Sequence, residues 1–125
     1  MMPALSESNN LGDLLKYEAP QFYSRQTVTV TDGQTLSLGS VVGVVSATGN
    51  IQALDPAAVD GTEVAAGVMI QDAAPSGADG EGLLIARHAI VADHALVWPV
   101  GITENEKASA TGQLIKAGIL VRQGV

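Results

Sequence analysis

The feature that most constrains the fold is the change, from Arg25 onward, to short apolar segments separated by turn-forming residues. Thr27 to Thr31 alternates threonine with valine, and a period of two places alternate side chains on opposite faces of a β-strand. Pairs such as Asp32-Gly33 and Asp60-Gly61 are typical of turns. The strands predicted in this way span residues 27–31, 41–45, 51–54, 64–70, 83–86, 89–91, 95–98 and 119–121.

One helix is predicted near the C-terminus. Thr103 and Glu106 have the spacing of a capping box, in which each side chain hydrogen-bonds the other residue's backbone N–H. Lys116 suits the negative end of the helix dipole, and Gly118 is a typical residue just beyond a helix end. The pattern therefore favours a mainly β fold with one C-terminal α-helix.

Length and charge narrow the class of protein. A chain of 125 residues has room for one domain, and its core must rely on aliphatic residues because only four residues are aromatic. The net charge of −7 disfavours nucleic acids and anionic membranes as partners. No cysteine is available for a disulfide or a thiolate metal site. We also expect no signal peptide, because the first ten residues have neither a basic start nor an apolar stretch. We expect no membrane span, because the uncharged run 33–54 contains many polar residues.

The N-terminal region differs from the rest of the chain. Residues 1–10 are polar and unpatterned, which predicts a loose terminus. Three of the four aromatic residues lie between Tyr17 and Tyr23. We therefore predict an extended N-terminal arm over 1–24 and a compact β-rich domain over 25–125.

The energetics of the arm indicate that it needs a surface to order against. Fixing about 13 backbone residues costs on the order of 13–26 kcal/mol, whereas burying six apolar side chains returns about 9–18 kcal/mol. Pairing with the sheet edge of another chain is one solution. Packing along its own domain is a second, and a third has Phe22 and Tyr23 docked on the domain while Leu11 to Tyr17 reaches out.

Two groups of residues are the candidate contacts. The predicted arm contacts are the apolar residues Leu11, Leu14, Leu15, Tyr17, Phe22 and Tyr23. Trp98 and Pro99 are candidates either for the core or for a contact between subunits.

Catalytic chemistry is poorly supported. His88, Asp93 and His94 are the one set that suggests a metal-dependent hydrolase, but an extended chain places the two histidines about 20 Å apart at ~3.3 Å per residue. Nucleophile-elbow, dinucleotide and phosphate-loop spacings are missing from the sequence. We therefore expect no enzyme activity, no metal and no cofactor.

Several segments together resemble the head decoration protein D family of tailed phages, whose best-known member decorates phage lambda. The resembling segments are Asn10–Glu18, Asp55–Ala58, Ala65–Val68, Leu96–Pro99, Gly101–Thr103 and Gly118–Val121. The first of these is similar to one branch of the family and not to lambda's own arm. The case for the family lies in the order and spacing of these segments.

The resemblance implies a β-clip-like small barrel or sheet domain and a homotrimer at local threefold sites on the outer capsid surface of the virion. It further implies assembly in the host cytoplasm, an arm that binds the major capsid protein, and stabilisation of the expanded, DNA-filled shell. Two alternatives stay open: another phage structural adaptor or virion module, and the small hydrolase that would use His88, Asp93 and His94.

Overall fold

The computed structural model describes residues 10–123, so the terminus predicted to be loose lies outside the described residues except for Asn10. Its elements are α1 (Leu11–Leu14), β1 (Leu15–Glu18), η2 (Pro20–Phe22), β2 (Arg25–Val30), β3 (Val41–Val44), β4 (Ile51–Ala53), β5 (Gly67–Met69), β6 (Gly80–Ile85), β7 (Ala89–Ala92), η3 (Asp93–Ala95), α2 (Glu104–Lys116) and β8 (Ile119–Arg122).

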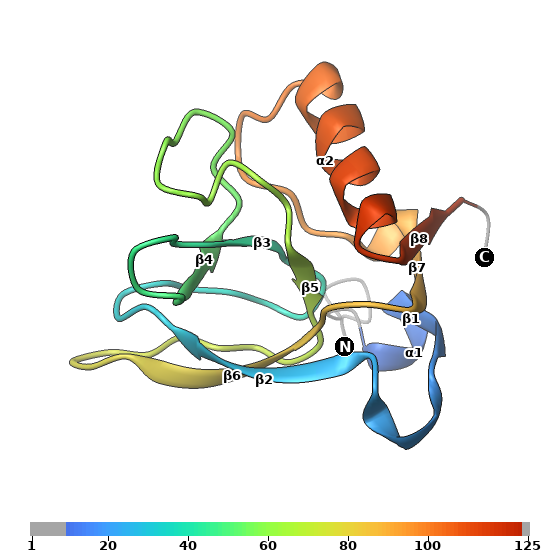
Figure 1. Ribbon diagram of the computed structural model, residues 1–125, viewed down its shortest axis with the longest axis horizontal. Helices are drawn as coiled ribbons and strands as arrows, with labels where there is room; N and C mark the ends of the chain where they lie inside the picture. The colour runs from blue at the N-terminus through green and yellow to red at the C-terminus, as the bar shows by residue number, and fades with distance from the viewer. Residues whose placement is uncertain (1–9, 124–125) are drawn as a thin grey trace, which may run out of the picture.

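Five strands close into a small barrel in the order β2-β4-β3-β5-β6 (Figure 1). β2 and β6 are antiparallel over their full lengths, from Arg25 opposite Ile85 to Val30 opposite Gly80. The barrel closes because Val30 also pairs in parallel with Ile51 of β4.

A second layer stands beside the barrel. It is a three-stranded sheet in the order β1-β7-β8, with β1 antiparallel and β8 parallel to β7. Helix α2 packs on β8, and α1 leads into β1 at the same end of the molecule (Figure 1). We call this part, with the loop from Ala19 to Ser24, the sheet end.

Two hydrophobic cores lie on opposite sides of the barrel wall. Successive residues of a strand point to opposite faces, so Val41 belongs to the core under the sheet end and Val42 to the barrel interior. Val68 and Met69 of β5 divide in the same way. Burial on both faces explains why these strands are continuously apolar, whereas β2 alternates exposed threonines with valines.

The predicted fold class is confirmed: the chain is mainly β, with a small barrel and one C-terminal helix. The capping box is present, since Thr103 Oγ1 accepts from Glu106 N–H at 3.1 Å and Glu106 Oε1 accepts from Thr103 N–H at 2.9 Å. Among residues 10–123, no helix has the length and hydropathy needed to span a bilayer.

The prediction of a strand at residues 95–98 was wrong. The short helix η3 ends at Ala95, and of residues 96–98 only Val97 makes a bridge, with Ser40. Val97 N–H donates to the carbonyl of Gly39 at 2.8 Å, but Pro99 has no N–H with which to continue a ladder. A buried apolar run alone does not distinguish a strand from a packed connecting segment.

Candidate functional site

The first part of the predicted arm packs on its own domain. Leu14 is completely buried in the core under the sheet end, and Leu11 and Leu15 pack against that core. Strand β1 pairs with β7, with Tyr17 opposite Ile90. Of the three arrangements left open by the sequence, residues 11–18 therefore adopt the intramolecular one, because β7 supplies the backbone partner that the arm needs.

The aromatic residues of the arm point outward instead. Tyr17 is 52% exposed, Phe22 65% and Tyr23 54%. The mixed arrangement, with Phe22 and Tyr23 docked and the leucines reaching out, is therefore wrong: the leucines are docked and the aromatic rings are exposed. The reason is that β1 ends at Glu18 and the chain turns at Pro20. Phe22 and Tyr23 therefore lie beyond the segment that pairs with β7.

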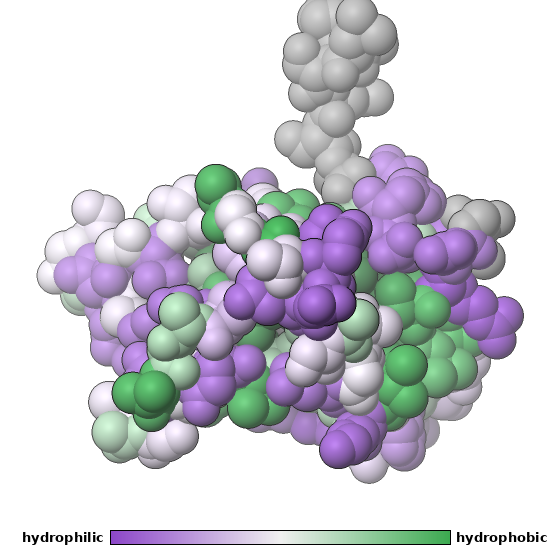
Figure 2. Space-filling model, turned by 90° about the horizontal axis from the view of Figure 1, so that it is seen from above, coloured by the Kyte–Doolittle hydropathy of each residue, from purple (hydrophilic) through white to green (hydrophobic). Residues whose placement is uncertain are grey.

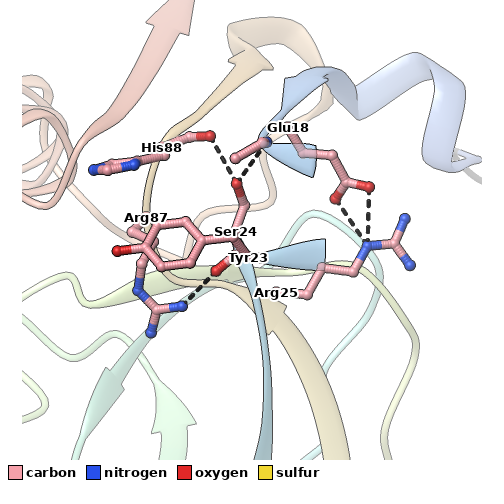
Figure 3. Close-up of polar contacts among 7 residues, drawn as sticks. Glu18, Tyr23, Ser24, Arg25, Arg87 and His88 are labelled. Atoms are coloured by element: carbon pink, nitrogen blue, oxygen red, sulfur yellow. Dashed lines mark hydrogen bonds and ion pairs between the residues drawn. The ribbon is translucent and has the colours of Figure 1, made fainter. Parts of the chain in front are cut away.

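A buried serine fixes the loop that carries these rings. Ser24 is fully buried, and its hydroxyl accepts from the N–H of Ala19 at 2.9 Å and donates to the carbonyl of His88 at 2.7 Å (Figure 3). The carbonyl of Ser24 accepts from Ala86 N–H at 2.8 Å. One side chain thus closes the loop and ties it to the β6–β7 connection.

Arg25 is held next to the loop by a carboxylate and a ring. Its Nε donates to both carboxylate oxygens of Glu18, at 2.8 and 3.2 Å (Figure 3). Its guanidinium carbon lies 4.6 Å from the centre of the Phe22 ring, a cation–π arrangement. Both charged side chains are mostly buried, with 23% of Arg25 and 20% of Glu18 exposed.

The ring of Tyr23 contacts two residues of the β6–β7 connection, Arg87 and His88. Arg87 donates from Nη1 to the carbonyl of Tyr23 at 2.7 Å and from Nη2 to Gln26 Oε1. Its guanidinium lies 5.4 Å from the Tyr23 ring, and the His88 ring lies 5.2 Å away on centroids. We call Phe22, Tyr23, Arg25, Arg87 and His88 the aromatic–arginine cluster.

The backbone is strained at this same place. Among residues 10–123, the non-glycine residues with left-handed φ angles are Gln21 at 60°, Phe22 at 58° and His88 at 48°. Each such conformation costs on the order of 1–3 kcal/mol and persists only where the surroundings impose it, commonly at binding sites. Sequence reasoning missed Arg25, Arg87 and His88 as members of the site, and no residue pattern signals the strain.

Replacing Ser24 with alanine should lower the free energy of unfolding by about 1–3 kcal/mol, because the Ala19 N–H and the His88 carbonyl both lose their partner. Urea denaturation followed by circular dichroism measures the change. Ser109→Ala makes the same substitution on the exposed face of α2 and should leave stability within about 0.5 kcal/mol. Equal effects of the two variants would show that Ser24 does not anchor the loop.

The histidine–aspartate alternative gains no geometric support. Within residues 10–123, no three histidine, cysteine, aspartate or glutamate side chains are close enough to hold a metal ion. His88 contacts Tyr23, whereas His94 and Asp93 belong to η3 and both are at least partly exposed.

The pKa of the Asp60 carboxyl group is lowered by hydrogen bonds from a neighbouring threonine. The side-chain hydroxyl of Thr62 donates to Asp60 at 2.6 Å, and its backbone N–H donates at 3.0 Å, so the pKa of Asp60 is lowered. These bonds close the loop before β5.

Trp98 and Pro99 are both partly buried. Trp98 packs against the core under the sheet end while part of its surface stays accessible. It lines a shallow hollow with Glu104, Lys107 and Thr111 of α2. Trp98 therefore contributes part of its surface to the core, and a contact between Trp98 and another subunit stays a prediction.

A family model matches most of the chain. The family model described as Bacteriophage lambda head decoration protein D matches residues 4–119 of the chain. A search of the curated proteins found no match.

Proposed function

Because the chain belongs to the bacteriophage lambda head decoration protein D family, it is a phage head decoration protein, and we propose that it binds the outer capsid surface as a trimer and stabilises the expanded shell. The match over residues 4–119 is the observation that carries this proposal. The proposed role is structural and needs no catalytic group.

The sheet end is the surface that we assign to the capsid. Within residues 10–123, β1 pairs on one side only, so its outer edge remains open to a strand of the major capsid protein. Tyr17 of β1 is exposed, as are Phe22 and Tyr23 in the segment that follows β1. Leu14 is excluded from direct contact because it is buried, and Leu11 and Leu15 contribute by holding β1 in place.

A trimer strengthens weak contacts. Three sheet ends that bind at once raise the overall affinity because the second and third binding events become intramolecular. A cyclic trimer requires two different, complementary patches on each subunit, and the partly exposed Trp98 and Pro99 are candidates for one of them. Trp98→Ala would then lower the oligomeric state as well as stability.

Stabilisation follows from selective binding. A ligand that binds the expanded shell more tightly than the unexpanded or broken shell shifts the equilibrium toward the expanded form. The free energy gained per site depends on the protein concentration relative to the dissociation constant.

The direct test is to mix the purified protein with empty expanded capsids of its phage, sediment them, and heat the complexes. Saturable co-sedimentation and a higher temperature of capsid disruption are expected. At a free concentration of 100 times the dissociation constant, each site should gain about 2.7 kcal/mol. A protein that stays in the supernatant, or that binds only at one vertex or at the tail, would contradict the proposal.

A further inference from the structure

The charge of the molecule is divided between its two ends. Residues 26–85, which build most of the barrel, contain seven of the 13 acidic residues and none of the six basic residues. Outside this range six acidic residues balance the six basic ones, and Lys16, Arg25 and Arg87 belong to or adjoin the sheet end. The barrel therefore repels an acidic partner, whereas the sheet end, which has no excess of acidic residues, does not. In Figure 2, apolar surface occurs in separate areas among polar ones rather than as one continuous patch.

Arg25 retains unused donors that point in a defined direction. Glu18 occupies Nε, and within residues 10–123 the two terminal nitrogens of Arg25 have no hydrogen-bonded acceptor. Figure 3 shows these nitrogens extending beyond the ion pair. The planar pair of terminal N–H groups matches the two oxygens of a carboxylate, and a lysine ammonium lacks this match.

The site is formed before any partner arrives. Glu18 and the Phe22 ring fix the guanidinium, Ser24 fixes the loop, and the strained backbone at Phe22 holds its ring outward. A side chain that is already ordered loses little conformational entropy on binding. The strain at Gln21 and Phe22 is thereby explained as the cost of a preformed contact.

We propose that the aromatic–arginine cluster binds an acidic segment of the major capsid protein, with Arg25 receiving an aspartate or glutamate carboxylate in a bidentate pair. The exposed Phe22 ring packs on the apolar stem of that residue, and Arg87 adds a second positive charge. This inference rests on the proposed capsid binding and names its chemistry. A nucleic acid is a poorer occupant, because it requires many clustered cations to neutralise successive phosphates, and this cluster contains two arginines.

The test compares Arg25→Lys with Arg122→Lys in co-sedimentation titrations against empty expanded capsids. Arg25→Lys keeps the charge and can still reach Glu18, but it lacks the planar pair of donors. Its affinity should fall about 10- to 100-fold, the size expected for charge-assisted hydrogen bonds. Arg122→Lys makes the same change at an exposed residue of β8 and should bind like the wild type. Thermal unfolding verifies that each variant is folded, and Phe22→Leu, which keeps the ion pair, gives a second test of the cluster.

Capsids whose surface carboxylates have been amidated with carbodiimide and glycinamide provide the complementary test. They should bind wild type and Arg25→Lys equally weakly. The inference fails if Arg25→Lys and Phe22→Leu bind capsids as tightly as the wild type and Arg122→Lys do. It also fails if Arg122→Lys loses as much affinity as Arg25→Lys. If the wild type does not bind capsids at all, the proposed function fails and this inference fails with it.

Discussion

Leu14→Ala should lower the free energy of unfolding by about 2–5 kcal/mol. Leu14 lies in the predicted arm but is completely buried in the core under the sheet end. Truncating it removes the transfer free energy of the lost methyl groups and leaves a cavity that α1 and β7 cannot fill without moving. Because the short α1 and β1 pack through this side chain, the variant should also expose residues 11–18 to proteolysis.

Leu120→Ala is the matched control. Leu120 lies on β8 of the same sheet and is 42% exposed, so its loss should cost well under half as much. Guanidinium denaturation measured by tryptophan fluorescence and circular dichroism gives both values. If Leu14→Ala proved as mild as Leu120→Ala, the first turn of the arm would not be part of the folded body, and the arm would be free as the sequence first indicated.

Gly39→Ala should destabilise the protein by roughly 2–6 kcal/mol. Gly39 has φ of +97°, a conformation strained by about 1–3 kcal/mol for other residues, and a Cβ there would overlap the backbone oxygen of Ala95. Relieving that overlap separates η3 from the barrel and costs about 1–3 kcal/mol more. It would also stretch the hydrogen bonds that Gly39 makes with Met69 and Val97, both 2.8 Å long.

Gly33→Ala separates the two contributions. Gly33 has nearly the same φ, +89°, but no atom lies within 4 Å of the place where its Cβ would stand. It should therefore show the backbone strain alone, about 1–3 kcal/mol. Equal losses in urea denaturation would show that the close approach of Gly39 to Ala95 does not hold the two layers together.

The regular elements could be predicted because their signals are local. The alternation of threonine and valine from Thr27 to Thr31 predicted β2. The capping-box spacing of Thr103 and Glu106 predicted the start of α2. Pairing between distant strands is not encoded locally, so the turn Asp32-Gly33 gave no hint that β2 would pair with β6 across the chain.

The site was harder to predict for a similar reason. Nothing in the sequence of residues 11–23 indicates a strand to pair with, whereas β7 of the same chain pairs with β1. Left-handed backbone at Gln21 and Phe22 is imposed by tertiary contacts, since neither residue type favours it, and His88 has a side chain only modestly more tolerant of it. Arg25 could be recognised only after folding placed Glu18 and Phe22 against it.

The orientation of the bound protein tests the account most directly, and electron cryo-microscopy of expanded capsids saturated with it measures that orientation. We expect density at every local threefold site, with Phe22 and Arg25 against the shell and the acidic barrel facing solvent. A map with the barrel loop around Asp60 against the shell and the aromatic–arginine cluster facing outward would contradict the account.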